Sequence, residues 1–369
     1  MFRSLTAALF IALGTTSSAQ VATSAGALAM TPVVEGLNSP WGFGFLPGGE
    51  IIMTEQEGRV LLVRPDSGVT ELSGAPDVVS RGQGGLLDVL VPRDFASSRE
   101  LFFTYSQRQG LGGAGTAVAK ARLSADGTRL DGLETIFETA PGGSGGRHFG
   151  SRLVEARDGT LYLTIGDRGD RPSAQDLTIE NGSVVRITKD GAIPLGNPFV
   201  GRSDVQPGIW SFGHRNPQGM ALDADGNIWT VEHGARGGDE INFIEPGNNY
   251  GWPVISYGRH YSGARIGEGT AKEGMEQPAH YWDPSIAPSG MMIYSGALFP
   301  DWRGDIFVGS LNSDLISRLD VSGRNVSEAE RIQSDETARV RDIREAPDGS
   351  IWFLSAGNGT LYRVTPASS

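Results

Sequence analysis

The 369-residue sequence contains no cysteine, which excludes both disulfides and thiolate metal ligands. Beyond its first twenty residues, no segment approaches the roughly 20 consecutive apolar residues that a membrane-spanning helix needs. Positive charge is scarce too, with 31 Lys and Arg against 43 Asp and Glu and a formal net charge of −12. An acidic surface opposes non-specific binding to nucleic acid and to anionic lipid. We therefore expect neither a nucleic-acid partner nor a membrane span.

The first twenty residues have the features of a secretory signal peptide. Arg3 supplies the positive start, Leu5 to Leu13 form a short apolar core, and small residues surround Ala19. We expect cleavage near Ala19, export to the periplasm or the medium, a short linker over residues 20–30 and one folded domain over residues 31–369.

Glycine and proline are abundant, at 53 and 20 residues. This exceeds ordinary usage and indicates many short elements joined by turns. The 15 Phe, 8 Tyr and 7 Trp spread along the chain disfavour disorder.

One pattern recurs six times: a small or glycine-led apolar strand, a tight turn, then an aromatic β-rich strand. The six copies start at Pro40, Gly84, His148, Asn216, Gly290 and Arg341. Several contain Asp-Gly between alternating apolar residues, a hairpin signal of the turn type that needs positive φ at both central residues.

Six hairpin-rich repeats predict an all-β, six-bladed β-propeller whose blades carry insertions of different length. The last repeat supplies only three clear strands, between Arg341 and Val364. We expect the segment Thr31 to Leu37 to provide its outer strand, which would complete the last blade and close a single domain. A set of separate β-sandwiches is the alternative architecture.

His148 and Asp167 form the first candidate site. His148 stands before an inner strand in the glycine-flanked segment GGRHFGS, and the hairpin that follows ends at Asp167. A histidine oriented by a carboxylate is a competent general base. The alternative is a histidine that only caps the strand or bonds a backbone carbonyl.

An oxygen-rich loop forms the second candidate site. Its side chains come from Glu232, Asp239, Glu240, Asn248, Asn249 and Tyr250. Hard cations such as Ca²⁺ take six to eight oxygen ligands, including the carbonyls that glycine-rich loops expose. A solvated acidic loop is the alternative.

Three arginines form the third candidate site. Arg339 and Arg341 alternate along one strand and so point to the same side, and Arg215 can join them. Guanidinium groups bind carboxylates in a bidentate manner, so a ligand with several carboxylates would suit them. Pairing of these arginines with Asp342 or Glu345 is the ordinary alternative.

The segments RGQGGLLDV, GHRNPQG, EHGARGGDEIN, GNNYGWP and RVRD resemble the soluble pyrroloquinoline quinone (PQQ)-dependent aldose sugar dehydrogenases of the glucose/sorbosone dehydrogenase group. The resemblance spans nearly the whole mature chain. It implies a six-bladed propeller that binds PQQ, a tricarboxylate, together with Ca²⁺.

By this resemblance, His148 is the catalytic base, Asp167 orients it, and Arg215 stabilises the developing oxyanion. The implied cofactor contacts are Gln83, Arg215, Asn216, Tyr261, Asn312, Arg339 and Arg341. The implied metal contacts are the carbonyls of Gly234 and Ala235 for the active-site Ca²⁺, and Glu240 and Tyr250 for a second Ca²⁺, with Asp239 in the same loop. Ala235 stands where some members have Pro, and the stretch around Asn312 lacks a Lys that some relatives present to PQQ.

The implied reaction oxidises the anomeric hydroxyl of an aldose to a lactone by hydride transfer to PQQ, with an external electron acceptor. A Ca²⁺-dependent propeller lactonase would leave the three arginines without a role, and a non-catalytic propeller would bind glycans or proteins. The sequence leaves the preferred sugar and the choice between monomer and homodimer open.

Overall fold

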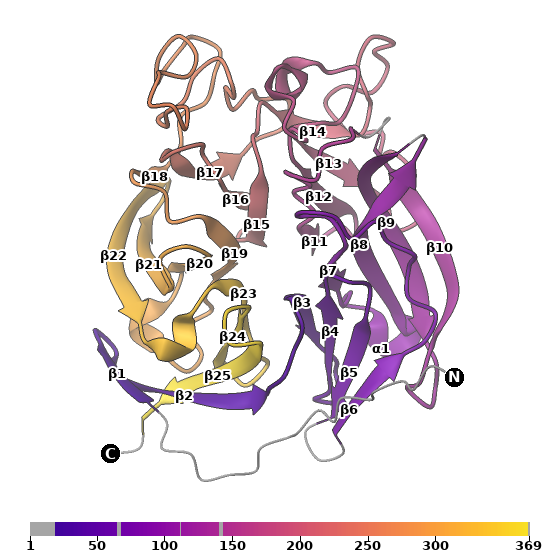
Figure 1. The fold of residues 1–369 in the computed structure, drawn as a ribbon, viewed down its shortest axis with the longest axis vertical. Helices are drawn as coiled ribbons and strands as arrows, with labels where there is room; N and C mark the ends of the chain where they lie inside the picture. The colour runs from indigo at the N-terminus through magenta and orange to yellow at the C-terminus, as the bar shows by residue number, and fades with distance from the viewer. Residues whose placement is uncertain (1–18, 65–67, 111, 140–142, 368–369) are drawn as a thin grey trace.

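The chain folds into six antiparallel β-sheets arranged as blades around a central axis, as a computed structural model shows (Figure 1). The model describes residues 19–64, 68–110, 112–139 and 143–367. The predicted six-bladed β-propeller is confirmed. Within the described residues, no helix is long and apolar enough to cross a membrane.

Each blade runs from an inner strand at the axis to an outer strand at the rim. The first three blades are β3 to β6 (Pro40–Phe45, Ile51–Glu55, Val60–Arg64, Gly68–Leu72), β7 to β10 (Leu86–Leu90, Glu100–Gln109, Gly113–Leu123, Leu130–Glu138) and β11 to β14 (Leu153–Glu155, Leu161–Ile165, Ser183–Ile187, Ile209–Phe212). The next two are β15 to β18 (Pro217–Leu222, Ile228–Glu232, Asp239–Ile244, His280–Trp282) and β19 to β22 (Pro288–Ile293, Ile306–Ser310, Leu315–Ser322, Asn325–Gln333). The described helices are short: α1 (Phe95–Ser98), η1 (Arg171–Gln175), η2 (Pro300–Trp302) and η3 (Asp335–Thr337).

The two ends of the chain meet in the sixth blade, as predicted. Its strands, from the axis outward, are β23 (Val340–Glu345), β24 (Ile351–Ser355), β25 (Thr360–Pro366), β2 (Gly26–Val34) and β1 (Ala19–Thr23). β2 pairs antiparallel with β25, with Met30 opposite Val364. This strand pairing between the two ends of the chain closes the ring.

The expected linker over residues 20–30 is wrong, because these residues form β1 and the first half of β2. The hairpin is held at its turn, where Trp302 Nε1 donates to Ser24 Oγ over 3.0 Å and the Ser24 amide donates to Glu330 over 2.9 Å. Residues 1–18, which include most of the predicted signal peptide, lie outside the described residues.

Apolar packing lies mainly between blades. Each interface between neighbouring blades holds its own cluster of buried aliphatic and aromatic side chains. Trp302 and Phe353, for example, are almost completely buried between the fifth and sixth blades. Since no single central core exists in this arrangement, the ring itself must close for every interface to be buried.

The Asp-Gly turns differ from the predicted type. Gly159, Gly226 and Gly349 have positive φ, but the aspartates before them do not. In the first of these turns the Gly159 amide donates to the Ala156 carbonyl and Ala156 in turn bonds Thr160. This is a type I turn followed by a left-handed glycine, which needs only one positive φ.

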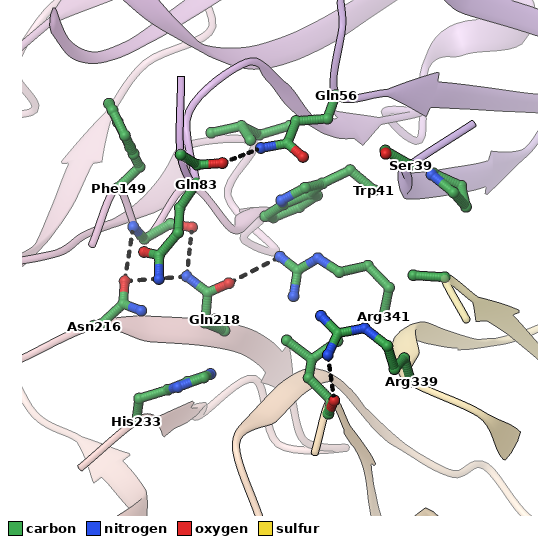
Figure 2. Close-up of a pocket in the computed structure, with 16 residues that line it drawn as sticks. Ser39, Trp41, Gln56, Gln83, Phe149, Asn216, Gln218, His233, Arg339 and Arg341 are labelled. Atoms are coloured by element: carbon green, nitrogen blue, oxygen red, sulfur yellow. Dashed lines mark hydrogen bonds between the residues drawn. The ribbon is translucent and has the colours of Figure 1, made fainter. Parts of the chain in front are cut away.

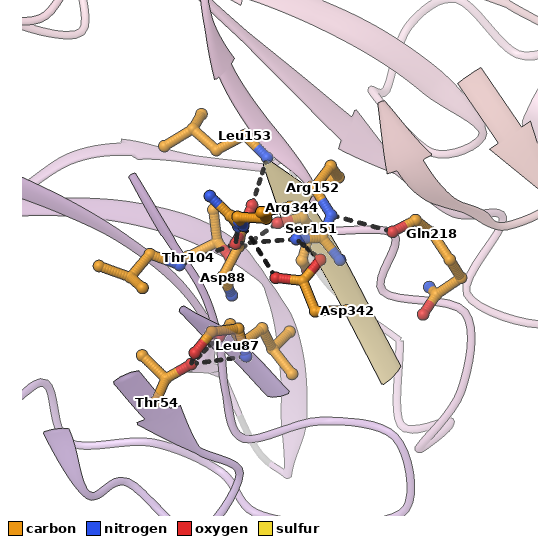
Figure 3. Close-up of polar contacts among 12 residues, drawn as sticks. Thr54, Leu87, Asp88, Thr104, Ser151, Arg152, Leu153, Gln218, Asp342 and Arg344 are labelled. Atoms are coloured by element: carbon orange, nitrogen blue, oxygen red, sulfur yellow. Dashed lines mark hydrogen bonds and ion pairs between the residues drawn. The ribbon is translucent and has the colours of Figure 1, made fainter. Parts of the chain in front are cut away.

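A buried network of ion pairs joins residues at the inner strands of three blades (Figure 3). Arg152 Nη1 lies 3.0 Å from both Asp88 and Asp342, and Arg344 lies 2.6 Å from Asp88 and 2.9 Å from Asp342. The inner strands approach closely here: a Cβ on Gly290 would lie 2.4 Å from Asp342 Oδ1. The network ties the second, third and sixth blades together.

Candidate active site

A pocket of about 320 Å³ opens at the mouth where inner strands begin and second strands end (Figure 2). Four predicted cofactor residues line it: Gln83, Asn216, Arg339 and Arg341. Sequence reasoning missed three others: Trp41, Gln218 and His233. Each of these lies within one of the six repeats, at the start of an inner strand or directly after a second strand. That position in the repeat could have identified them as pocket residues.

His148 and Asp167 meet, as predicted, directly before Phe149 and Gly150, which line this pocket. His148 Nδ1 lies 2.6 Å from Asp167 Oδ1, and Asp167 Oδ2 accepts from Trp252 Nε1 over 2.8 Å. The backbone amide of His148 donates to Gln83 Oε1 over 2.6 Å. Because Asp167 holds Nδ1, the proton of the neutral ring is assigned to Nδ1 and the lone pair to Nε2. Nε2 makes no hydrogen bond to any described residue.

Burial lowers the pKa of His148, and the positive charge of Arg215 adds to this, while the hydrogen bond to Asp167 opposes it. Burial alone would raise the pKa of Asp167, but its bonds to His148, Gly169 and Trp252 outweigh that effect and lower it. At neutral pH the pair is therefore a carboxylate beside a neutral imidazole that is able to accept a proton.

Arg341 and Arg339 lie on one side of the pocket. Arg341 Nη2 donates to Gln218 Oε1 over 2.9 Å, and its guanidinium lies 3.9 Å from the centre of the Trp41 ring. Arg339 is exposed and donates to the Leu311 carbonyl over 2.8 Å. The predicted pairing of Arg341 with an anionic ligand therefore remains geometrically open, since its partners here are neutral.

Arg215 lies next to the pocket beside Trp252 and donates to the His233 carbonyl over 3.3 Å. Three buried nitrogen atoms in this area have no hydrogen-bond partner among the described residues: Arg215 Nε, Arg341 Nη1 and His233 Nε2. Burial lowers the pKa of Arg341 to about 9 and that of His233 to about 3. The two guanidinium nitrogens are donors, and a buried donor without a partner is costly until an anion binds it, whereas the His233 ring stays neutral.

The Gly234 loop borders a second cavity of about 610 Å³, which His233 separates from the first. Tyr261, 72% exposed, and Asn312 line this second cavity rather than the first pocket, and Asn312 donates to the Ser285 carbonyl over 3.2 Å. A Cβ on Gly234 would lie 2.2 Å and 2.3 Å from the carbonyl oxygens of Gly237 and Gly238. Only glycine permits this close approach, which gathers backbone oxygens.

Asp239 holds the Gly234 loop in place through both of its carboxylate oxygens. Its Oδ1 accepts from the Gly234 amide over 2.8 Å, and its Oδ2 accepts from Ser285 Oγ and the amides of Ile286 and Ala287. Both carboxylate oxygens are thus engaged by protein donors. Asp239 thereby anchors the Gly234 loop, and its predicted contact with a cation stays a prediction.

Glu232 and Glu240 line a small adjacent cavity with Tyr250. Burial and the charge of Glu232 raise the pKa of Glu240 well above its ordinary value. The Tyr250 hydroxyl already donates to the Phe243 carbonyl and accepts from the Glu245 amide, so any bond to a cation would use its backbone carbonyl. No three His, Asp or Glu side chains gather as a metal site in the described part of the chain.

The chain is similar to known sugar dehydrogenases in sequence and in fold. Residues 37–363 match the Glucose / Sorbosone dehydrogenase family. The chain is 43% identical over 336 residues to the aldose sugar dehydrogenase YliI of Escherichia coli (strain K12), covering 89% of this chain and 91% of that protein.

Two solved structures are similar in fold. The apo-form of the soluble aldose sugar dehydrogenase from Escherichia coli is 41% identical with a TM-score of 0.89, over 92% of this chain and 100% of that one. The PQQ-bound form of the aldose sugar dehydrogenase from Streptomyces coelicolor is 26% identical with a TM-score of 0.78, over 94% and 99%. The chain belongs to the glucose/sorbosone dehydrogenase family.

Proposed function

We propose that this protein is a PQQ- and Ca²⁺-dependent oxidoreductase that oxidises the anomeric hydroxyl of aldose sugars to lactones. The observation that carries the proposal is the His148–Asp167 pair directly before residues that line a pocket where buried guanidinium nitrogens lack partners. The names of the relatives, which are aldose sugar dehydrogenases, support the reaction class. The PQQ-bound relative supports the cofactor.

The pocket residues fit a tricarboxylate. Arg341 offers an unpaired Nη1, Arg215 an unpaired Nε, and Arg339 an exposed guanidinium at the rim. In the proposal these three arginines and Asn216 hold the carboxylates and ring oxygens of PQQ, with Gln83 beside it. Bound there, PQQ supplies the two-electron acceptor that takes hydride from the anomeric carbon.

The Gly234 loop suits a hard cation because it is rich in glycine, and glycine-rich loops expose the backbone carbonyls that Ca²⁺ takes as ligands. We assign the carbonyls of Gly234 and Ala235 to the active-site Ca²⁺, which would act as a Lewis acid toward the cofactor. A second Ca²⁺ is assigned to the Glu240 carboxylate and the Tyr250 carbonyl. Asp239 supports the first site by fixing the loop.

His148 performs the proton transfer. Its neutral Nε2 accepts the proton of the anomeric hydroxyl, and Asp167 holds the tautomer and stabilises the imidazolium that forms. The lowered pKa of His148 keeps the ring neutral at neutral pH. Arg215, whose charge reaches His148 and Asp167, stabilises negative charge on the sugar oxygen.

The reduced cofactor must pass its electrons to an external acceptor, and we expect this outside the cytoplasm because of the predicted signal peptide. The test is to add PQQ and Ca²⁺, singly and together, to purified apo-protein and to follow sugar-dependent dye reduction. Activity that appears only with both supports the proposal. Lactone hydrolysis without PQQ would instead indicate a lactonase, and neither activity would indicate a binding protein.

A further inference from the structure

Arg168 is a buried cation that the reaction described above does not use. Its side chain is 5% exposed, and no carboxylate in the described part of the chain lies within ion-pair distance of it. Its guanidinium donates only to backbone carbonyls: Nη2 to Gly145 over 2.7 Å and to Ala114 over 3.1 Å, and Nη1 to Arg147. Burial lowers the pKa of Arg168 to about 10, so it stays charged at neutral pH.

These contacts grip the chain on both sides of His148. Gly145 and Arg147 precede His148, and the Arg168 guanidinium lies 3.3 Å from the centre of the ring of Phe149, which follows it. Phe149 in turn forms part of the pocket wall (Figure 2). The planar fork of arginine suits several carbonyls and an aromatic face at once, which a lysine ammonium does not.

The segment needs such a restraint. His148 has a φ of 54°, in the left-handed region that a non-glycine residue adopts only at a cost, and glycines on either side add backbone freedom. Asp167, the residue before Arg168, holds the His148 ring by Nδ1. Two consecutive residues thus contact the same histidine segment, one through its ring and the other through its backbone.

We propose that Arg168 is a positioning residue that fixes the direction of His148 Nε2 by holding the carbonyl of Arg147 and the ring of Phe149. This inference rests on the proposed function in which His148 is the base. Arg168→Lys keeps the charge but loses the fork. We expect it to lower kcat about ten- to hundredfold, the scale of a base displaced by about 1 Å, while KM for the sugar changes less than about threefold.

A second readout does not depend on turnover. In the apo-protein, the Nδ1 proton of His148 in its short bond to Asp167 is expected to give a far-downfield proton NMR resonance, which His148→Gln identifies by its loss. In Arg168→Lys this resonance should broaden or move upfield. In Arg168→Ala, added methylguanidinium should restore part of the lost kcat.

Arg318→Lys is the matched control. Arg318 is similarly buried, at 6% exposed, but is paired with Asp305 and Glu330 in the fifth blade. It should lower the melting temperature without moving kcat or the His148 resonance. The inference is overturned if Arg168→Lys keeps wild-type kcat and resonance, or if both Lys variants lose kcat in proportion to their melting temperatures. If the wild type lacks PQQ-dependent activity, the proposed function fails, and an unchanged resonance in Arg168→Lys would still overturn the positioning role.

Discussion

The described residues include two buried histidine–carboxylate pairs whose Nε2 atoms have different surroundings. In the first, His148 Nδ1 bonds Asp167 over 2.6 Å, and in the second, His214 Nδ1 bonds Glu232 over 2.9 Å. His214 Nε2 is occupied by Ser211 Oγ at 3.0 Å, whereas His148 Nε2 has no partner among the described residues. We therefore expect the first pair to act in catalysis and the second in stability, because only His148 Nε2 is free to accept a proton from a substrate.

Together with Ser211, the second pair has the residue types of a serine hydrolase triad, but a substrate cannot reach it. Ser211 and His214 are completely buried, and His214 stacks on Tyr250 with ring centres 4.6 Å apart. Glu232 also accepts from the Arg215 amide over 2.6 Å. We infer that Ser211 and His214 stabilise the buried start of the fourth blade and perform no chemistry.

Replacing the two histidines should give the largest contrast. His148→Gln should lower kcat by about 10³-fold, since it removes the proton acceptor, while PQQ binding stays near normal. His214→Gln should keep kcat within about threefold and lower the free energy of unfolding by about 1–3 kcal/mol. Steady-state kinetics, PQQ titration and denaturant unfolding measure these effects. Near-normal turnover in His148→Gln would remove His148 from the mechanism.

Asp167→Asn should reduce kcat about 10²-fold and also move the pH profile. Asp167 raises the pKa of His148 against the lowering effect of burial, so its neutralisation should lower that pKa further. Activity is lost as pH falls through the pKa of the base, because the protonated ring cannot accept a proton. The acid limb of kcat/KM should therefore move to lower pH. A move to higher pH would contradict the assigned pairing.

Trp252→Phe should have a smaller effect, because it removes the indole donor to Asp167 Oδ2 but keeps an aromatic ring beside Arg215. We expect kcat to fall about tenfold, equivalent to the roughly 1.4 kcal/mol of one hydrogen bond to a charged group. Trp282→Phe is the matched control, since Trp282 Nε1 also donates to a carboxylate, that of Glu328, over 3.1 Å. The control should lose stability and keep kcat. Equal losses of kcat in the two variants would show a general packing effect.

Sequence reasoning found the ring and the first pair for the same reason. Hairpin periodicity marks the strands, and because Asp167 ends the hairpin that follows His148, the two return to one edge. It did not find contacts that depend on loop conformation. Asp239 Oδ2 accepts from three donors in residues 285–287, which only the folded loop brings near.

The sequence pattern also did not identify several residues of the pocket wall. Trp41 and Gln218 are ordinary inner-strand residues by pattern, and their contacts with Arg341 come from other blades. The role of Arg168 depends on its left-handed backbone, with φ of 55°, which turns the side chain back toward the His148 segment. Neither spacing nor residue type signals such a turn, since few non-glycine residues adopt it.

Ser211→Ala should have the smallest effect and directly tests the second pair, His214 and Glu232. The change leaves His214 Nε2 buried without its partner, so the free energy of unfolding should fall by about 1 kcal/mol. Sugar oxidation should be unchanged, because Ser211 is completely buried and contacts neither His148 nor Asp167. If the purified protein hydrolysed lactones and Ser211→Ala abolished that hydrolysis, the second pair would be catalytic, and the accessibility of Nε2 would no longer separate the two histidines.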